Sequence, residues 1–370
     1  MNVNSGLPPI VLSTGRAIGP GEPCFVAAEI GANHQGDTYT AIRLLKVAHE
    51  AGVDAVKLCK RHVPSELTRE AYNQPYCGPQ SFGQTYGKHR EALELSPAEY
   101  RHIKDRMRYN QWPEVMFATA CDVQSVDDLE ESIQPPLFKV ASRDLDNLPL
   151  LRCMAALGKP VVLSTGMARD DAEIQVAIEI LRNAGCPVLL MVCTSEYPTP
   201  NAHVRLYRLA EYRQKFGVLV GLSDHTAGIT ACIAAVALGA CAVEKHITLS
   251  RSMKGTDHAA SLEPDGIRRM VAKLREVEEM LGGNGEFVDV TEARNKLGRS
   301  LVSVRAIKAG EIVTWDCLTL KSPGTGIPYC EASKLVGKIA RRDIPADVTL
   351  DESDVMNRVL SGLEIDNVFA

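Results

Sequence analysis

Two lysines stand inside short apolar stretches of the sequence, where a charged side chain is unusual. Lys57 lies in DAVKLC and Lys139 lies in LFKVAS. Burying an ammonium group without a partner is costly, so each lysine is expected to face an anion. With the hydroxyls of Ser142, Ser164 and Ser223 they would form a cradle for a phosphate and a carboxylate, here called the anion cradle. The alternative is a structural ion pair between each lysine and a neighbouring carboxylate.

Two histidines, here called the histidine pair, follow or end successive apolar stretches. His225 follows VLVGLSD and His246 lies in AVEKHI. Side by side, two imidazoles could hold a divalent metal ion and leave open positions on it. No third protein ligand is evident in the sequence, so substrate oxygens and water would complete the coordination shell. For a single histidine, a hydrogen-bonded structural role would be the preferred interpretation. The presence of two histidines together favours metal binding.

Three carboxylates are candidates for proton transfer. Glu29 lies in the apolar stretch FVAAEIG, where the loss of hydration should raise its pKa toward that of a general acid or base. A salt bridge to one of the two lysines is the alternative for Glu29. Asp144 and Asp257 are further acid candidates, and both are expected on loops.

The stretches that carry these residues belong to a regular alternation of short apolar runs and longer amphipathic segments. The apolar runs are FVAAEIG (25–31), DAVKLC (54–59), EVMFATA (114–120), LFKVAS (137–142), PVVLSTG (160–166), PVLLMVC (187–193), VLVGLSD (218–224) and AVEKHI (242–247). Continuous apolarity suits strands that are buried on both faces of a parallel sheet. Eight strand–helix units predict a (β/α)8 TIM barrel, an α/β fold whose catalytic residues lie at the C-terminal ends of its strands.

The pattern divides the chain into two domains. The predicted barrel domain spans residues 1–282 and ends in a helix from about Pro264 to Leu281, followed by a linker at 283–295. Short strands, turns and single helical turns predict a small mixed domain over residues 296–358. Residues 60–96 are the longest break in the barrel pattern, and an insertion of this length after a barrel strand is usually a functional loop.

The composition limits the class of partner. The chain has 370 residues, 45% of them hydrophobic and 24% charged, which is typical of a soluble globular protein. Its net charge of −5 offers no basic field for nucleic acid or an anionic membrane. No segment approaches the ~20 apolar residues of a membrane span, and the N-terminal residues lack a signal-peptide pattern. Eleven cysteines without a CxxC pair favour reduced thiols, so we expect a cytoplasmic protein with small-molecule substrates.

The ordered motifs of the chain resemble those of the N-acetylneuraminate (sialic acid) synthase family. They are AEIGANHQGD, DAVKLCK, FKVASRDLDNLPLL, PVVLSTGM, CTSEYPTP, GLSDHT, EKHITL and GTDHAASLEP. The segment from GRSLVSVRAIKAGE through VGKIARRDI resembles the antifreeze-like (SAF) domain that closes this family. The order and spacing match from about residue 20 to residue 355.

The resemblance implies a metal-dependent transferase that uses phosphoenolpyruvate. This enzyme would condense phosphoenolpyruvate with an N-acyl amino-sugar aldehyde, N-acetylmannosamine or its 6-phosphate, to give N-acetylneuraminate or its 9-phosphate, and phosphate. The histidine pair would hold Mn²⁺ or Mg²⁺. A domain-swapped homodimer is also implied, in which Arg299 reaches into the active site of the partner subunit.

The resemblance also assigns roles to individual residues. The implied catalytic residues are Glu29, Asp144, Lys57 and Lys139; the implied substrate-binding residues are Ser142, Ser164, Ser195, Tyr197, Ser223, Asp257 and Arg299; the implied metal ligands are His225 and His246. Within these sets, Tyr197 and Asp257 would hold the sugar, whereas Ser195 would join the anion cradle around phosphoenolpyruvate.

The chain departs from the common family pattern in three places. Many bacterial members carry Glu where Asp144 stands and Asn where Ser195 stands. KSPGTG replaces the more common, arginine-bearing RPGTG. Arg299, in GRSLV, is our choice for the residue that reaches the partner. The segments SFGQTYGKHREALELS and KGTDHAASLEP resemble the animal branch, which makes the 9-phosphate.

Three alternative functions are open to the same sequence. A legionaminic or pseudaminic acid synthase would act on a diamino sugar through the same site. A barrel aldolase would use a lysine Schiff base, which the histidine pair and the hydroxyls of the anion cradle do not favour. An ice- or carbohydrate-binding module on an inactive barrel would not need polar residues at nearly every strand end.

Overall fold

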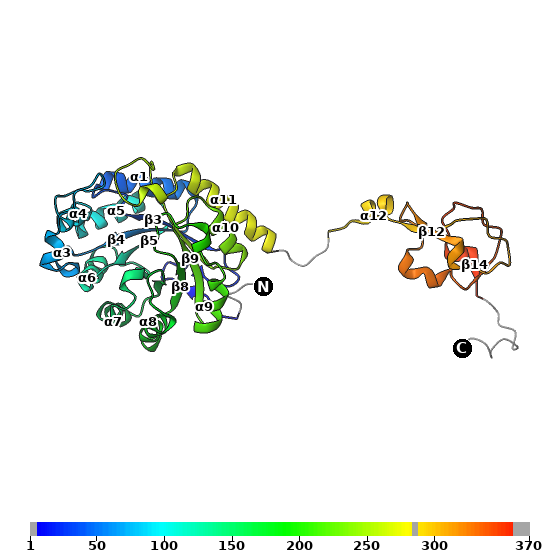
Figure 1. The fold of residues 1–370 in the computed structure, drawn as a ribbon, viewed down its shortest axis with the longest axis horizontal. Coiled ribbons are helices and arrows are strands. Elements are labelled where there is room, and N and C mark those ends of the chain that lie inside the picture. Colours follow the sequence, from blue (N-terminus) through cyan, green and yellow to red (C-terminus); the bar gives the residue numbers. More distant parts are fainter. Residues whose placement is uncertain (1–5, 283–287, 358–370) are drawn as a thin grey trace. The chain divides into compact units, whose positions relative to one another are not determined.

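The computed structural model describes residues 6–282 and 288–357 of the chain. The chain divides into two compact units, Met1–Gly283 and Asn284–Ala370 (Figure 1). Residues 1–5 of the predicted barrel domain, 283–287 of the predicted linker and 358 of the predicted small domain lie outside the described residues. Each unit has a hydrophobic core of its own.

The first unit is a closed barrel of parallel strands surrounded by helices, which confirms the predicted TIM barrel (Figure 1). Its strands follow the order β10-β3-β4-β5-β6-β7-β8-β9 around the barrel. Their bounds are β3 Phe25–Gly31, β4 Ala55–Lys60, β5 Val115–Ala120, β6 Phe138–Val140, β7 Val161–Ser164, β8 Val188–Cys193, β9 Leu219–Asp224 and β10 Ala242–His246. A separate antiparallel pair, β1 (Ile10–Val11) and β2 (Ala17–Ile18), precedes them.

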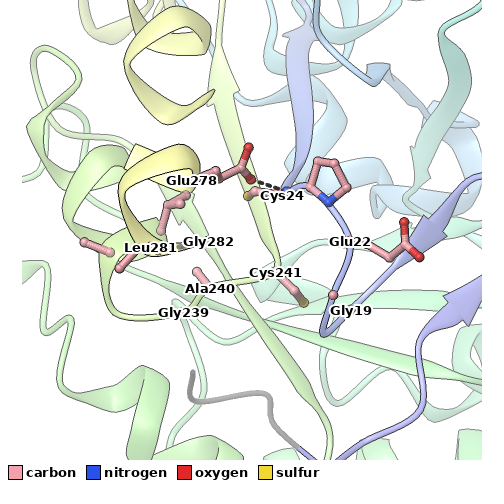
Figure 2. A pocket seen from close by; sticks show the side chains of 13 residues that line it. Gly19, Glu22, Cys24, Gly239, Ala240, Cys241, Glu278, Leu281 and Gly282 are labelled. Atoms are coloured by element: carbon pink, nitrogen blue, oxygen red, sulfur yellow. Dashed lines mark hydrogen bonds between the residues drawn. The ribbon is translucent and has the colours of Figure 1, made fainter. Parts of the chain in front are cut away.

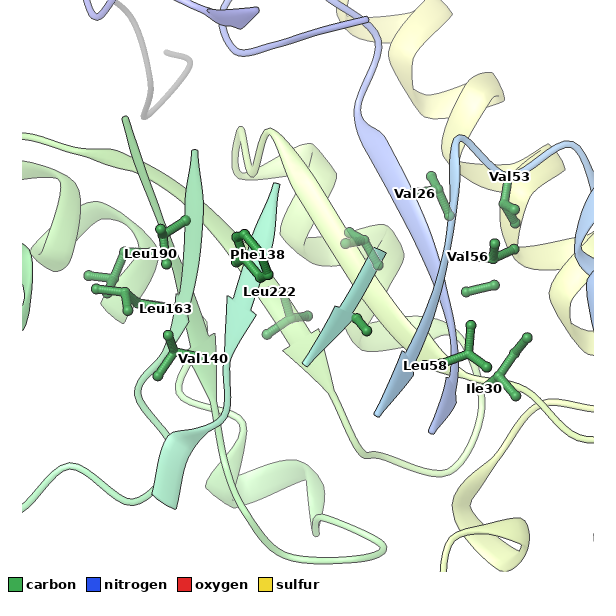
Figure 3. Close-up of a cluster of buried hydrophobic side chains, with 14 of the residues drawn as sticks. Val26, Ile30, Val53, Val56, Leu58, Phe138, Val140, Leu163, Leu190 and Leu222 are labelled. Atoms are coloured by element: carbon green, nitrogen blue, oxygen red, sulfur yellow. The ribbon is translucent and has the colours of Figure 1, made fainter. Parts of the chain in front are cut away.

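Side chains alternate between the two faces of each barrel strand. On β3, Val26 and Ile30 point outward into the core beneath the helices (Figure 3). Phe25 and Ala27, on the other face of the strand, belong to the inner core. Because the side-chain period of a strand is two, residues two positions beyond the inner apolar residues also point into the barrel. Polar residues occupy these positions. The inner polar residues are Glu29, Lys57, Thr119, Lys139, Ser164, Ser223, Glu244 and His246.

The lower half of the barrel interior is apolar. Phe117, Leu189 and Met191 pack there, and Ile10 and Ile18 from the β1–β2 pair belong to the same cluster. Polar inner side chains therefore occur only toward the C-terminal ends of the strands. This apolar floor excludes water from below the buried lysines, which strengthens the electrostatic interactions above it.

Helices cover the outside of the barrel. Their bounds are α1 Thr38–Ala51, α5 Pro97–Tyr109, α6 Val123–Ser132, α7 Leu148–Ala156, α8 Asp171–Asn183, α9 Arg208–Phe216, α10 Thr230–Ala237 and α11 Pro264–Leu281. Local sequence fixes several of their starts: α1 is capped by Asp37, and α5 begins with a capping box formed by Ser96 and Glu99. The last barrel helix has the bounds expected from the sequence.

The insertion at residues 60–96 contains short helices and is not an extended loop throughout. It contains α2 (Val63–Glu66), α3 (Arg69–Asn73) and α4 (Tyr86–Glu91). Its segment around Phe82 reaches the loop that follows β10: the Lys254 ammonium lies 4.6 Å from the Phe82 ring centroid, and the Gly255 N–H donates to the side chain of Gln80. The insertion therefore lies beside a loop that carries a predicted site residue, Asp257.

The second unit is a small mixed domain, as predicted. It contains α12 (Thr291–Leu297) and the strands β11 (Ser300–Ser303), β12 (Leu318–Lys321), β13 (Ile339–Ala340) and β14 (Val355–Met356). β11 pairs with β12, and β13 pairs with β14, in both cases antiparallel. Over the described parts of the two units, no helix is long and apolar enough to cross a membrane.

Candidate active site

A buried cluster of two lysines and two glutamates fills the upper part of the barrel interior. Lys139 Nζ lies 3.2 and 3.1 Å from the two carboxylate oxygens of Glu244. Lys57 Nζ contacts the carboxyl group of Glu29 and lies 3.8 Å from Glu244 Oε2. The hydroxyl of Ser223 donates to Glu244 Oε1 at 3.0 Å. Each lysine therefore has a carboxylate partner, the ion pairing that the sequence left open as an alternative.

The two carboxylates of this cluster differ in their affinity for protons. Burial raises the pKa of Glu29 to about 8, although the charge of Lys57 opposes this shift. Burial acts in the same direction on Glu244, but the ammonium groups of Lys139 and Lys57 outweigh it and lower the pKa to about 2. Near neutral pH, Glu29 therefore holds a proton and Glu244 does not. Burial also lowers the pKa of Lys139, which leaves Glu244 as the group that keeps this lysine charged.

Hydroxyl groups converge around Gly166, just after β7. The Gly166 N–H donates to Ser142 Oγ at 2.9 Å. A β-carbon on Gly166 would lie 2.5 Å from Ser195 Oγ and 3.0 Å from Ser142 Oγ, so both hydroxyls lie close against this glycine. The Ser164 hydroxyl is buried and has no hydrogen-bond partner. A buried hydroxyl without a partner is costly, and a bound ligand oxygen would satisfy it.

The histidine pair lies beside Tyr197 at the ends of β9 and β10. The ring centroids of His225 and His246 are 5.4 Å apart, and the Tyr197 centroid lies 4.0 Å from that of His225. His225 Nδ1 lies 2.8 Å from the Thr194 carbonyl oxygen, and Nε2 lies 2.9 Å from Tyr197 Oη. Because a carbonyl only accepts, Nδ1 carries the proton, and in the neutral imidazole Nε2 keeps its lone pair.

The donor set of the histidine pair fits a divalent metal ion. A backbone carbonyl that holds one imidazole nitrogen protonated is the usual outer partner of a metal-binding histidine, and Thr194 plays that part for His225. Nδ1 of His246 is buried without a partner, and burial lowers the pKa of His246 to about 3, so this imidazole is neutral. Within residues 6–282 and 288–357, no group of three or more His, Cys, Asp or Glu side chains could hold a metal. Water and substrate oxygens would have to complete the shell.

Asp257 lies near His246 and Glu29, beside Gly31. A β-carbon on Gly31 would lie 2.9 Å from Glu29 Oε1, 3.6 Å from His246 Cε1 and 3.8 Å from Asp257 Oδ2. Three predicted site residues therefore surround one glycine at the end of β3. Asp257 lies just before a short 3-10 helix (His258–Ala260), on the loop that the insertion contacts.

Asp144 belongs to a second charged group at the barrel mouth. Its Oδ2 lies 3.3 Å from Arg143 Nε, and Arg143 Nη2 lies 3.0 Å from Glu66 Oε1. Arg61 joins this group through Glu66, at 3.4 Å, and Glu94, at 2.9 Å. Burial raises the pKa of Asp144 to about 6, against the opposing charge of Arg143. The ion pair of Asp144 is thus with an arginine rather than with either lysine of the anion cradle.

Arg299 lies in the second unit, at the residue before β11. Its side chain is exposed, and Nη1 donates to the Leu320 carbonyl at 3.3 Å. The barrel residues above all belong to the first unit, so their geometry does not include Arg299. Its role in a partner subunit stays a prediction.

Comparison with known proteins identifies the family. The sequence model of the NeuB family matches residues 44–286, and that of the SAF domain matches residues 298–356. The chain belongs to the NeuB family. The resemblance to sialic acid synthases with a terminal SAF domain is thereby confirmed.

Relatives of this NeuB family chain span nearly its whole length. It is 38% identical over 351 residues to the N-acetylneuraminate-9-phosphate synthase of Homo sapiens, covering 94% of this chain and 96% of the relative. It is 34% identical to the N,N'-diacetyllegionaminic acid synthase of Campylobacter jejuni, covering 89% of this chain and 99% of the relative. Among solved structures, the N-acetylneuraminic acid synthetase of Leptospira borgpetersenii is 28% identical with a TM-score of 0.67, over 77% of this chain and 94% of that one.

One residue at the centre of the candidate site was not singled out from the sequence. Glu244 contacts both buried lysines, yet only its neighbour His246 was chosen from AVEKHI. The signal was present, because Glu244 is a carboxylate inside an apolar strand, the argument that selected Glu29. Cys193 was also missed; its sulfur lies 3.7 Å from Ser142 Oγ and 3.9 Å from His225 Nδ1.

A cavity at the other end of the barrel is separate from this site. It has a volume of about 520 Å³ and lies where β3 and β10 begin, beside the end of α11 (Figure 2). Cys24, Cys241, Glu278 and Leu281 are among its lining residues. Catalytic groups of TIM barrels lie at the C-terminal ends of the strands, so we place the active site at the histidine pair and the anion cradle.

Proposed function

We propose that this protein is a metal-dependent transferase that condenses phosphoenolpyruvate with N-acetylmannosamine or its 6-phosphate. The products would be N-acetylneuraminate or its 9-phosphate, and phosphate. The observation that carries the proposal is the placement of two buried lysines, Lys57 and Lys139, at the same barrel end as the histidine pair. The identity with an N-acetylneuraminate-9-phosphate synthase over 94% of the chain supports the substrate class.

Phosphoenolpyruvate would bind on the anion cradle together with Ser195. With Glu29 protonated, the two ammonium groups face a single carboxylate, Glu244, and the cluster attracts an anion. The partnerless hydroxyl of Ser164 would gain an acceptor from the phosphate or the carboxylate. Ser142 and Ser195 lie close enough around Gly166 to donate to the same ligand.

The histidine pair would hold Mn²⁺ or Mg²⁺, which when bound polarises the aldehyde oxygen of the open-chain sugar as a Lewis acid. The chain itself keeps the histidine nitrogens ready. The Thr194 carbonyl fixes the tautomer of His225, and burial keeps His246 neutral. Tyr197 and Asp257, which flank the two rings, would bond the sugar hydroxyls and orient its aldehyde.

Two carboxyl groups with different pKa values would move the protons of the reaction. In the proposed sequence, C3 of phosphoenolpyruvate attacks the aldehyde carbon, water adds at C2, and phosphate leaves by cleavage of the C–O bond. Glu29, with a pKa of about 8, would donate a proton to the developing alkoxide. Asp144, with a pKa of about 6, is ionised near neutral pH and would accept a proton from the attacking water.

A synthase acting on a diamino sugar is the second candidate. It is supported by the 34% identity to an N,N'-diacetyllegionaminic acid synthase and by 32% identity to a pseudaminic acid synthase, both of Campylobacter jejuni. A Schiff-base aldolase is less well supported, because carboxylates raise the pKa of Lys57 against the effect of burial, and Lys139, whose pKa burial lowers, is paired with the carboxylate of Glu244. A protonated amine is not a nucleophile.

We also propose that the protein acts in the cytoplasm as a domain-swapped homodimer. The SAF domain of one subunit would close the barrel of the other, with Arg299 contacting the bound substrate. This arrangement follows from the family resemblance, and subunit exchange can test it directly.

The proposed function is tested by offering a panel of aldehydes together with phosphoenolpyruvate and Mn²⁺. The panel contains N-acetylmannosamine, its 6-phosphate and the N-acylated diamino sugars, and the readouts are phosphate release and product mass. Phosphate release with a mannosamine derivative supports the proposal. Turnover of diamino sugars alone would favour the second candidate. If none of the aldehydes in the panel supported phosphate release, both candidates would be refuted.

A further inference from the structure

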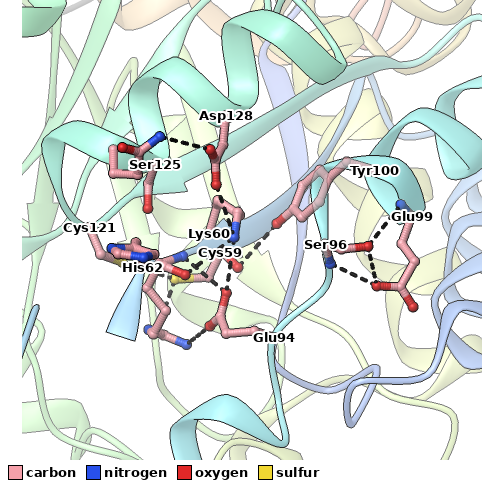
Figure 4. Close-up of polar contacts among 12 residues, drawn as sticks. Cys59, Lys60, His62, Glu94, Ser96, Glu99, Tyr100, Cys121, Ser125 and Asp128 are labelled. Atoms are coloured by element: carbon pink, nitrogen blue, oxygen red, sulfur yellow. Dashed lines mark hydrogen bonds and ion pairs between the residues drawn. The ribbon is translucent and has the colours of Figure 1, made fainter. Parts of the chain in front are cut away.

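Two cysteine sulfurs lie in contact at the mouth of the barrel, outside the groups assigned above. The sulfur atoms of Cys59, on β4, and Cys121, just after β5, are 3.4 Å apart (Figure 4). The Cys121 N–H donates to the Lys60 carbonyl at 3.1 Å, which holds the two strand ends side by side. Disulfide sulfurs lie about 2.0 Å apart, so closure requires an approach of ~1.4 Å. Side-chain rotation can supply a movement of that size.

The two thiols differ in exposure and in charge. Cys59 is half-buried at the mouth of the barrel, whereas Cys121 is 3% exposed. Arg61 Nη2 donates to the Cys59 sulfur at 3.0 Å. The hydrogen bond from Cys121 lowers the pKa of Cys59 well below its usual range; burial opposes this, and the charges of Arg61 and Arg143 lower it further. An accessible thiol in positively charged surroundings is the type that reacts with oxidants.

We propose that Cys59 and Cys121 are a peroxide-reactive thiol pair, which closes to a disulfide and weakens phosphoenolpyruvate binding. In the first step the Cys59 thiolate attacks the hydroxyl oxygen of a hydroperoxide and the O–O bond breaks. The departing alkoxide or hydroxide takes up the proton that the Cys59 thiol released, and leaves as an alcohol or water. The sulfur is now a sulfenic acid. The Cys121 thiol then attacks this sulfur, the S–S bond forms, and the hydroxyl leaves as water with the thiol proton. Two thiols are oxidised by two electrons, and one hydroperoxide is reduced.

The link to substrate binding rests on the proposed function and on the strand register. Lys57 precedes Cys59 by two residues on the inner face of β4, and its ammonium donates to Thr119 Oγ1 at 2.9 Å. Thr119 precedes Cys121 by two residues on β5. A disulfide ties the ends of the two strands that carry this contact, and it removes the sulfur acceptor of Arg61. We expect the KM for phosphoenolpyruvate to rise about tenfold, the effect of losing one hydrogen bond to a charged group.

The thiol chemistry is tested by peptide mapping of the full-length protein. The reduced protein is treated with hydrogen peroxide, alkylated and digested. A peptide pair joined through Cys59 and Cys121 is expected, and Cys121→Ser should leave Cys59 as a sulfenic acid that dimedone traps. Cys77→Ser, at an exposed cysteine, is the matched control and should leave the crosslink unchanged. Oxidation of Cys77 with Cys59 still reduced would overturn the proposal.

The effect on the site is tested by kinetics on the same samples. Peroxide should raise the KM for phosphoenolpyruvate in the wild type, dithiothreitol should restore it, and Cys121→Ser should not show the crosslink-dependent rise. A complete crosslink with unchanged KM would overturn the proposed effect on phosphoenolpyruvate binding. If the reduced wild type releases no phosphate with any sugar, the proposed function fails, while the peptide map still decides whether the thiol pair exists.

Discussion

The Glu244 carboxylate joins the two lysines of the anion cradle, with Oε2 at 3.1 Å from Lys139 Nζ and 3.8 Å from Lys57 Nζ. All three side chains are nearly inaccessible to solvent. Glu244 therefore keeps both ammonium groups charged and oriented before any substrate arrives. A charge cluster built in advance needs little rearrangement when an anion binds.

Glu244→Gln is expected to destabilise the protein, because the buried ammonium groups of Lys57 and Lys139 would lose the carboxylate that they share. Removing one partner of a buried ion pair costs about 3–5 kcal/mol of unfolding free energy. Urea denaturation of the variant measures this loss. Glu276→Gln, at an exposed ion pair with Lys273, is the control and should change the unfolding free energy by less than about 1 kcal/mol. Equal stability of the two variants would show that Glu244 does not hold the lysines.

Lys57→Ala and Lys139→Ala should each impair the use of phosphoenolpyruvate. Losing one partner of a desolvated charge pair costs on the order of 2–5 kcal/mol, or roughly 30-fold to several thousandfold in kcat/KM. Steady-state kinetics with phosphoenolpyruvate as the varied substrate measures the effect, with exposed Lys46→Ala as the control. If KM and kcat both stayed within about twofold of the wild type, the two lysines would be structural ion-pair residues only.

The unfolding free energy should depend on pH through Glu29. The folded pKa of about 8 lies above the ordinary value of 4.5, so between these values the folded protein holds a proton that the unfolded chain has lost. The stabilising contribution of Glu29 is fully present below pH 4.5 and is lost as pH rises toward 8. Over this window the unfolding free energy should fall by at most about 1.4 kcal/mol per pH unit. Denaturation of metal-stripped wild type and Glu29→Gln across this window should give profiles whose difference changes with pH. Parallel profiles would contradict the raised pKa.

Much of the barrel could be predicted because its strands are buried on both faces and read as continuous apolar runs. Lys57, Lys139 and Glu29 stood out for the same reason, since a charge is conspicuous in such a run. The partner of each charge could not be predicted, because the register of neighbouring strands decides which inner side chains meet. Glu244 carried the same sequence signal as Glu29, but its contacts with both lysines depend on strand register. The contact between Cys59 and Cys121 likewise depends on the register of β4 and β5.

Subunit exchange should test the predicted role of Arg299. If Arg299 completes the barrel of the partner subunit, the inactive variants Arg299→Ala and His246→Ala should complement each other when mixed. About half of the dimers would be mixed after random exchange, each with one intact site, so activity should recover to about one quarter of the wild type. Each variant mixed with itself is the control. No recovery in demonstrated heterodimers would mean that Arg299 does not act across subunits.

The most direct test of the central claim is phosphate release from phosphoenolpyruvate and N-acetylmannosamine 6-phosphate before and after removal of the metal. The proposed mechanism predicts that release requires both substrates, stops with EDTA and returns with Mn²⁺. It also predicts that His225→Ala and His246→Ala abolish release, because one imidazole cannot hold the ion at useful affinity. Full activity of the metal-stripped protein, or of either histidine variant, would contradict it.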